Sequence, residues 1–415
     1  MKYKVFWCKV NKYYTDAWLN SKYMQNKSGV FIASCVVTDQ AKKKWIKFVK
    51  TEITELKNNE KIYISWCWAF KDWKWQENFF EIYSELKEFK NKIEILPETP
   101  PTLFPSQWKK FRKSLNKLPK LNLTTKKFLL IQWWCDSFCT FCLTVIKRWK
   151  HFYRSREDIV QEIVDFEMKW WKEIVLTWVN LWAWWKENTN DYKESKLSEI
   201  LEYILKKTEI PRIKISSLGP EFVDDKVLKI FQNKRILPHF HFSIQSWSSN
   251  ILKLMKRHYD SEYIKNLLKK TKEIKREDWV PISIWADLIV GFPTETESDF
   301  LQTLDLVKNY WITKVHGFPF SAHNFWETVP ASFFPNQIPE KTKKERITKL
   351  LEVAKNVRID FIKSQVWRTF EVLVESVKDG IFKWWTENYI EVTNKNFEVI
   401  SGKVKKNEII VGKLK

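Results

Sequence analysis

Short apolar runs alternate with longer charged segments of helix-forming residues over residues 1–95 of the chain. The three runs are Tyr3–Phe6, Val30–Ala33 and Ile62–Ser65. Alternation of this kind is typical of βαβ units, in which each buried strand is followed by a crossover helix. The pattern therefore predicts a small N-terminal α/β domain built on a parallel sheet.

A cysteine follows each of these three runs after one intervening residue. The cysteines are Cys8, Cys35 and Cys67. Ligands of parallel α/β sheets bind beyond the carboxyl ends of the strands. We therefore expect the three thiols to converge at one edge of the sheet.

The alternation of strand and helix patterns resumes at residue 128 and continues to residue 320. The expected strands are Phe128–Gln132, Glu173–Thr177, Arg212–Ser216, His239–Ile244, Pro281–Val290 and Thr313–Phe318. The helical segments between them include Asp158–Lys169, Asp224–Phe231 and Ser261–Arg276. Six such units predict an open, partial (β/α)6 barrel, related to the eight-fold barrel, with its chemistry at the carboxyl ends of the strands.

A proline-rich stretch and a lysine-rich stretch separate these two regions, and a charged helix at Lys341–Lys363 precedes a β-rich tail. The expected tail strands are Thr369–Ser376, Tyr389–Thr393, Glu398–Ile400 and Ile409–Leu414. They predict a small antiparallel barrel of a kind that often binds nucleic acid. The expected organisation is an N-terminal domain at 1–96, a linker at 97–127, the partial barrel at 128–338, a helical connector at 339–367 and the β domain at 368–415.

The chain carries 72 basic against 50 acidic residues, a formal net charge of +22. This excess favours a polyanionic partner, most simply a nucleic acid. A generally lysine-rich proteome would give the same excess without a partner. No apolar stretch reaches the roughly 18 residues of a membrane span, and the start of the chain is typical of a strand and not of a signal peptide. We expect a cytoplasmic monomer without a membrane partner.

Tryptophan and glycine occur in unusual proportion, with 25 Trp and 7 Gly. Average usage of about 7% would give roughly 29 glycines. Several tryptophans stand directly before a cysteine, where a residue without a side chain is expected: Trp7, Trp66 and Trp133–Trp134. Our hypothesis is that most of these tryptophans are glycines in the living cell, in a lineage that reads the UGA codon as glycine. The alternative is a truly tryptophan-rich protein with aromatic platforms for bases or sugars.

Cys135, Cys139 and Cys142 lie on one loop after the first strand of the predicted barrel. Three thiolates at this spacing can bind three irons of a 4Fe–4S cluster. The fourth iron is then left open, as catalysis requires, whereas a structural site is closed by a fourth ligand. S-adenosylmethionine can chelate such an iron and be cleaved to a 5′-deoxyadenosyl radical. The alternative is a zinc site with His151 as its fourth ligand.

With Trp read as Gly, six segments carry a resemblance to a known family. They are GCKVN at Trp7–Asn11, SGC at Ser65–Cys67, GGCDSFCTFC at Trp133–Cys142, KEIVLTGVNLG at Lys172–Trp182, IQSGS at Ile244–Ser248 and ADLIVGFPTET at Ala286–Thr296. The chain resembles the radical S-adenosylmethionine methylthiotransferases and, within them, the MtaB-type group that acts on threonylcarbamoyl-adenosine in tRNA. The resemblance covers essentially the whole chain.

The resemblance implies two 4Fe–4S clusters and S-adenosylmethionine as cofactors. Cys135, Cys139 and Cys142 would hold the radical-generating cluster. Cys8, Cys35 and Cys67 would hold an auxiliary cluster that delivers sulfur to carbon 2 of the modified adenine. Further residues are implied at the cofactor: Phe141, Thr177, Asn180, Gln245, Ser246, Asp287, Gly291 and Glu295. Each polar residue among them could instead be an ordinary cap or turn former at the end of a strand.

The resemblance leaves the substrate open among three related groups: threonylcarbamoyl-adenosine in tRNA, isopentenyl-adenosine in tRNA, and an aspartate of a ribosomal protein. Four segments favour the first group: Lys9–Asn11, Val37–Thr38, Val179–Leu181 and Thr386–Tyr389. The tail resembles a TRAM domain, which binds tRNA, and the expected partner is the anticodon stem-loop. The segments Thr144–Lys147 and Ser321–Trp326 depart from the family pattern. A reductase and a sulfur donor would be further partners. A non-catalytic iron–sulfur RNA-binding protein is the alternative from another class.

Overall fold

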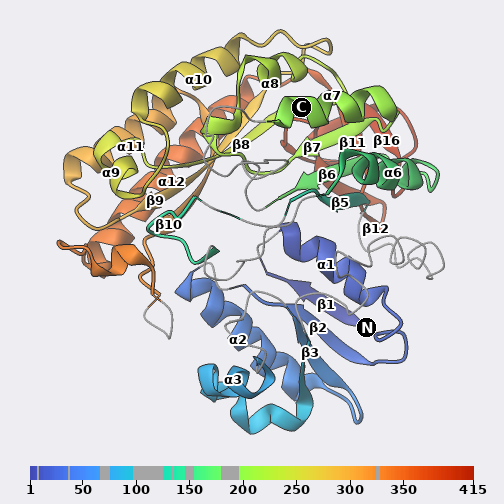
Figure 1. The fold of residues 1–415 in the computed structure, drawn as a ribbon. Coiled ribbons are helices and arrows are strands. Elements are labelled where there is room, and N and C mark those ends of the chain that lie inside the picture. Colours follow the sequence, from blue (N-terminus) through green and yellow to red (C-terminus); the bar gives the residue numbers. More distant parts are fainter. Residues whose placement is uncertain are drawn as a thin grey trace. The chain divides into compact units, whose positions relative to one another are not determined.

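The computed structural model describes most of the chain, which divides into two compact units (Figure 1). The described residues are 1–6, 9–35, 38–65, 75–96, 125–132, 135, 137–144, 154–178, 196–323 and 328–415. The first unit comprises residues 1–123, 142–152 and 321–329, and the second comprises 124–141, 153–320 and 330–415. Cys8, Cys67, Asn180 and His151 lie outside the described residues, as does almost all of the expected linker. The four boundaries between the five expected segments stay a prediction.

The first unit contains a four-stranded parallel sheet in the order β1-β2-β3-β4. Its elements are β1 (Lys2–Val5), α1 (Lys9–Leu19), β2 (Gly29–Ala33), α2 (Asp39–Glu55), β3 (Lys61–Ser65), α3 (Trp75–Ile82), η1 (Ser84–Lys92) and β4 (Ile93–Ile95). Every residue of β2 is buried, as expected for a parallel strand covered on both faces. The predicted parallel sheet is thus confirmed, and β4 is a strand that the apolar pattern missed.

The second unit contains six parallel strands in two three-stranded sheets, β5-β6-β7 and β10-β9-β8. The strands are β5 (Lys126–Leu130), β6 (Glu173–Thr177), β7 (Arg212–Ile215), β8 (His239–Gln245), β9 (Ser283–Val290) and β10 (Ile312–Pro319). Isolated bridges join the two sheets beside β7 and β8, and the Leu218 amide donates to the His241 carbonyl at 2.7 Å. All six predicted barrel strands are confirmed, with ends that differ by a few residues.

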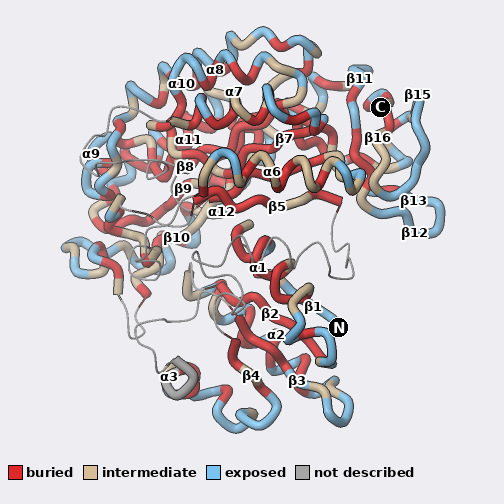
Figure 2. The backbone as a smooth tube through the Cα atoms, turned by 45° about the vertical axis from the view of Figure 1, so that its right-hand side comes forward, coloured by how far each residue is buried: buried red, intermediate tan, exposed pale blue. Residues whose placement is uncertain are grey.

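Helices cover these strands on one side, and the strands form the buried centre of the unit (Figure 2). The helical elements are α6 (Arg156–Glu167), α7 (Leu197–Lys207), η5 (Pro220–Phe222), α8 (Asp225–Ile230), α9 (Ser249–Leu254), α10 (Ser261–Glu273), α11 (Glu297–Asn309), η6 (Pro330–Phe333) and α12 (Glu340–Lys363). Alternate strand residues carry the apolar core, for example Ile213 and Ile215. Several of the residues between them are polar and buried. Among these, Glu173 forms an ion pair with Lys126 Nζ at 2.8 Å and accepts a hydrogen bond from Arg212 Nε at 2.9 Å.

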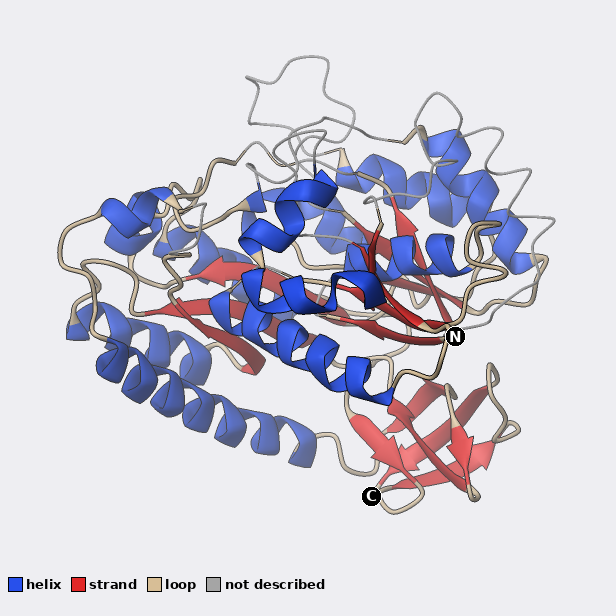
Figure 3. Ribbon diagram, turned by 90° about the horizontal axis from the view of Figure 1, so that it is seen from below, coloured by secondary structure: helices blue, strands red, loops and turns tan. Residues whose placement is uncertain are grey.

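The C-terminal strands form two antiparallel three-stranded sheets that lie as a separate group beyond α12 (Figure 3). They are β11 (Thr369–Leu373), β12 (Val377–Lys378), β13 (Ile381–Trp385), β14 (Glu391–Thr393), β15 (Phe397–Ser401) and β16 (Ile409–Leu414). Asn388 Nδ2 donates to the Pro281 carbonyl at 3.1 Å and links this β domain to the barrel. The antiparallel tail is confirmed, but β12 and β13 were not expected, and the expected strand at Tyr389 begins only at Glu391.

Four tryptophans have left-handed backbone conformations, and they are the only described tryptophans with exposed side chains. The φ angles are +64° at Trp170, +57° at Trp279, +54° at Trp311 and +69° at Trp367. Their side chains are between 44% and 81% exposed. A side chain with a Cβ is strained in this region, whereas glycine is not. These positions have the backbone that the glycine hypothesis predicts.

The conformation at Trp170 has a clear local cause, because α6 ends there in a Schellman turn. The Trp171 amide donates to the Phe166 carbonyl at 3.1 Å, and the Trp170 amide donates to the Glu167 carbonyl at 2.9 Å. The residue in the left-handed position of this turn is usually glycine.

No helix among the described residues is long and apolar enough to cross a membrane.

Candidate iron–sulfur centre and cofactor site

The loop with three cysteines begins directly after β5, at the carboxyl end of the strand. Cys139 is buried, and Cys135 and Cys142 are half-buried. All three are thiols and not disulfides. The loop turns through Phe138, whose φ is +44°. Three thiols on one short loop match the donor set of a 4Fe–4S cluster with one open iron.

Hydrogen bonds from neighbouring elements fix this loop. The Thr140 amide donates to the Met255 carbonyl at 3.3 Å, and its hydroxyl donates to the Leu254 carbonyl at 2.8 Å. The Ala331 amide donates to the Thr140 carbonyl at 2.9 Å. The carbonyl groups at the end of α9 therefore hold the middle of the cysteine loop. These bonds fix the position of Cys139, which precedes Thr140.

Two of the sulfur atoms also accept hydrogen bonds. Arg257 Nη1 donates to Cys139 Sγ at 3.3 Å. The Thr144 amide donates to Cys142 Sγ at 3.3 Å. Hydrogen bonds to the ligating sulfurs are a feature of protein-bound iron–sulfur clusters. These contacts therefore fit a cluster, and the zinc alternative stays untested because its His151 lies outside the described residues.

In the first unit, the strand ends that precede the other three cysteines lie side by side. Val5 is paired with Ala33, and Ala33 is paired with Ser65. Cys35 follows this edge and is fully buried. Asn11 of α1 is also fully buried, and its Nδ2 donates to the Ser34 carbonyl at 2.9 Å. The chain thus leaves all three strands at one edge, and the ligand role of the cysteines stays a prediction.

The expected cofactor residues at the ends of β6 and β8 are largely engaged with the protein itself. The buried Thr177 hydroxyl donates to the Leu129 carbonyl at 3.0 Å. Gln245 has a φ of +72° at the end of β8. The Ser246 hydroxyl accepts from the Ser248 amide at 3.2 Å, next to the start of α9. These contacts match the cap and turn alternative. The side chain of Phe141 is half-buried, and its role at the cofactor stays a prediction.

Gly291 and Glu295 are brought together after β9. The Gly291 amide donates to Glu295 Oε2 at 2.6 Å, and Arg346 Nη1 donates to the same oxygen at 2.6 Å. Burial raises the pKa of Glu295 to about 7, although both donors oppose the shift. Gly291 has a φ of +68°, and a Cβ there would collide with the side chain of Lys343. Only glycine fits this turn.

Asp287 lies in a cluster with two histidines that the motif analysis did not single out. His241 Nε2 lies 2.8 Å and His316 Nδ1 lies 3.3 Å from Asp287 Oδ1. Burial opposes ionisation of this carboxylate, but the two rings outweigh burial and hold the pKa of Asp287 well below its usual range. The alternation in His239–Ser243 is a sequence signal that places His241 on the polar face of its strand, whereas the pairing of His316 with Asp287 is seen only in the fold.

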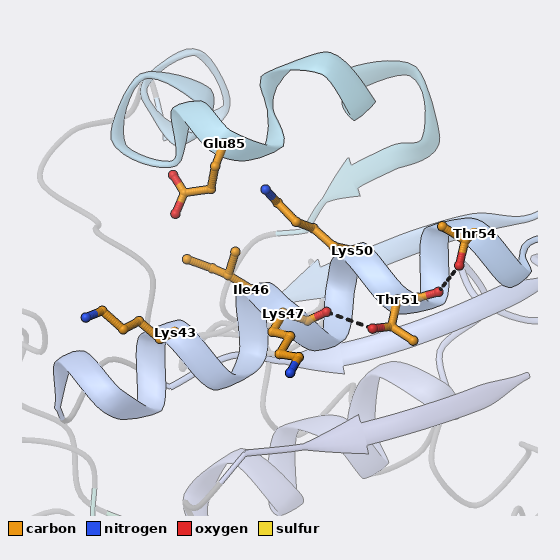
Figure 4. Close-up of a pocket in the computed structure, with 7 residues that line it drawn as sticks. All are labelled: Lys43, Ile46, Lys47, Lys50, Thr51, Thr54 and Glu85. Atoms are coloured by element: carbon orange, nitrogen blue, oxygen red, sulfur yellow. Dashed lines mark hydrogen bonds between the residues drawn. The ribbon is translucent and has the colours of Figure 1, made fainter.

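A hollow of about 660 Å³ lies over α2 and η1 in the first unit (Figure 4). It is lined by Lys43, Ile46, Lys47, Lys50, Thr51, Thr54 and Glu85. None of the expected cluster or cofactor residues that the structure describes lines this hollow.

Comparison with known proteins agrees with this geometry. A model of the radical SAM superfamily matches residues 129–307. This range runs from β5 through β9 into α11 and includes the loop with three cysteines, whereas β10 lies beyond it. The fold and the loop therefore define a radical S-adenosylmethionine enzyme.

Three relatives identify a family within this class of enzymes. The chain is 30% identical over 420 residues to the threonylcarbamoyladenosine tRNA methylthiotransferase MtaB of Thermotoga maritima, covering 94% of this chain and 90% of the relative. It is 29% identical to the protein of that name from Bacillus subtilis, over 71% of this chain and 64% of that relative. It is 33% identical to the tRNA-2-methylthio-N(6)-dimethylallyladenosine synthase of Bacillus subtilis, over 65% of this chain and 51% of that relative. The chain belongs to the radical SAM methylthiotransferase family, whose cofactors are 4Fe–4S clusters and S-adenosylmethionine.

Proposed function

We propose that this protein is a tRNA methylthiotransferase that adds a methylthio group to carbon 2 of threonylcarbamoyl-adenosine. The main support is the extent of the likeness. The MtaB relative of Thermotoga maritima matches 94% of the chain, whereas two dimethylallyladenosine synthases match 65% and 73% of it. The likeness to the first relative therefore includes more of the chain outside the shared radical SAM region.

In this proposal two groups of three cysteines each hold a 4Fe–4S cluster. Cys135, Cys139 and Cys142 hold the first, and Cys8, Cys35 and Cys67 hold the second. When bound, the clusters and S-adenosylmethionine supply a radical that removes hydrogen from carbon 2 and the sulfur that replaces it. The contribution of the chain is to fix the thiols.

Two sets of contacts support this role of the chain. Thr140 docks the first loop on α9, and Arg257 donates to Cys139 Sγ. In the first unit, Asn11 binds the segment before Cys35 and thereby fixes the strand end that leads to that thiol. Each group thus has at least one thiol held by elements remote in sequence.

Binding of tRNA is supported by the formal net charge of +22 of the whole chain and by exposed lysines on the C-terminal β domain. These lysines include Lys378, Lys383, Lys395, Lys403 and Lys405. Exposed cations on a compact β domain bind phosphates without reading the base sequence. This β domain is proposed to hold the tRNA, while the cofactor region acts on the base.

The test is a nucleoside mass spectrum of bulk tRNA from a host without its own methylthiotransferases. The host would express the gene with glycine codons at the tryptophan positions, and a matched strain would carry Cys139→Ala. We expect methylthio-threonylcarbamoyl-adenosine in the first strain only. Methylthio-isopentenyl-adenosine would instead move the substrate to the sister group, which the 33% identity to dimethylallyladenosine synthases makes the second candidate. Neither nucleoside, from protein shown to hold both clusters, would overturn the tRNA proposal.

A further inference from the structure

The guanidinium of Arg257 lies in the barrel unit beside the cysteine loop and is largely buried, with 9% of its side chain exposed. Its Nη1 donates to Cys139 Sγ at 3.3 Å, and its Nε donates to the Tyr259 hydroxyl at 2.8 Å. Its Nη2 lies 3.4 Å from both Glu221 Oε1 and the Ser243 carbonyl. Each nitrogen of the fork therefore faces a different acceptor, and one of these acceptors is a candidate iron ligand.

The surrounding contacts fix the direction in which Arg257 points. Its amide donates to the Leu252 carbonyl at 2.9 Å, so the residue closes the end of α9. The Tyr259 hydroxyl donates to the Ser243 carbonyl at 2.7 Å. The same helix end also accepts both hydrogen bonds from Thr140. The cation and the thiol are thus held against one another by a shared helix end and the end of β8.

We propose that Arg257 is a positioning residue that sets the reduction potential of the cluster held by Cys139. The inference rests on the proposed function, because it takes Cys139 as an iron ligand. A cluster gains one negative charge when it accepts an electron. A charge-assisted hydrogen bond to a ligating sulfur stabilises that reduced form more than the oxidised form and raises the potential.

A purely structural role for Arg257 makes a different prediction. Its contacts with Glu221 and Ser243 alone would explain a loss of folding stability on substitution. They would not explain a change in the potential of a fully occupied cluster. Potential and stability therefore have to be measured separately.

The experiment uses the full chain with Cys8, Cys35 and Cys67 replaced by alanine, so that only one cluster gives a signal. In this background we compare Arg257→Gln, Arg257→Lys and the control Lys253→Gln. Lys253 is an exposed cation of the same helix α9. Iron and sulfide content, thermal unfolding and an EPR-monitored redox titration are measured for each protein.

At equal iron content, Arg257→Gln is expected to lower the ratio of reduced to oxidised cluster at a fixed potential by about tenfold, a shift of about 59 mV to more negative values for one electron. Arg257→Lys keeps the charge but not the planar fork, so its potential is expected between that of Arg257→Gln and the parent. Lys253→Gln is expected to match the parent. A parental potential in both Arg257 variants would overturn the inference. If Arg257→Gln loses its iron, the potential of the Arg257→Lys variant is compared with that of the parent instead. A potential equal to that of the parent then overturns the inference. Failure of the parent to bind any cluster would instead refute the proposed site itself.

Discussion

Replacing the four exposed tryptophans by glycine should stabilise the protein. Trp170, Trp279, Trp311 and Trp367 combine a positive φ with an exposed ring, so the substitution removes strain. The packing lost is smallest at Trp170 and Trp279 and largest at Trp311, which is 44% exposed, so the gain should be smallest there. A left-handed residue with a Cβ costs about 1–2 kcal/mol. The greater freedom of glycine in the unfolded chain returns about 0.5–1 kcal/mol of that.

The difference is a gain of about 0.7 kcal/mol per site and about 3 kcal/mol for the four together, if the distant sites add. Urea unfolding of each single variant and of the fourfold variant measures it. The midpoint should rise with little change in the slope, because the surface exposed on unfolding hardly changes.

Alanine at the same positions provides the matched control. Trp170→Ala removes the ring but keeps the Cβ, so it should be less stable than Trp170→Gly by the same net difference of about 0.7 kcal/mol. At Trp45, which is fully buried within α2, glycine should destabilise instead. If glycine is no better than alanine at all four exposed sites, the backbone argument for the glycine hypothesis is wrong.

Three further predictions concern buried polar groups and a helix cap. Glu173→Gln leaves Lys126 and Arg212 buried beside a neutral amide and should cost about 3–5 kcal/mol in chemical unfolding. Burial raises the pKa of Glu387 to about 7, so its contribution to stability is fully present below the ordinary pKa of about 4.3 and is lost as pH rises through about 7. Glu387→Gln should flatten that part of the stability profile, and an unchanged slope between pH 5 and 8 would contradict it. Thr296 closes a capping box with Asp299 at the start of α11, so Thr296→Ala should lower the unfolding free energy by about 1 kcal/mol, with a gain or no change counting against the cap.

The strands could be predicted from the sequence because their apolar runs are short, continuous and separated by charged helices. The same reasoning placed the three N-terminal cysteines at one edge, and the pairing of Val5, Ala33 and Ser65 agrees with it for the strands that precede them. The short strand β13 was missed because Ile381–Trp385 alternates apolar and polar residues only weakly and ends in two tryptophans. Glycine normally marks turns in a sequence, and with only 7 glycines this chain offers few such signals.

The contacts around the candidate centre could not be predicted, because they join positions far apart in the chain. Arg257 reaches Cys139 over 118 positions. Asp287 contacts His241, which lies 46 positions away in the sequence. This contact depends on the register between neighbouring strands, which only the fold defines. A motif reveals residues that share a segment, such as Gly291 and Glu295, and cannot reveal a side chain that arrives from another strand or helix.

Trp285 provides a second test of the glycine hypothesis, in which stability and activity should move in opposite directions. Its ring is buried in β9, with its centroid 4.7 Å from that of His239 and 5.4 Å from that of His316. Loss of a buried tryptophan costs about 3–5 kcal/mol, so Trp285→Gly should lower the unfolding free energy. If position 285 is glycine in the cell, however, the indole fills space beside Asp287 and His316 that the active protein keeps open. Production of 5′-deoxyadenosine from S-adenosylmethionine should then rise in Trp285→Gly at equal iron content. A truly tryptophan-rich protein would lose both stability and activity, and that joint loss would refute the glycine assignment at this position.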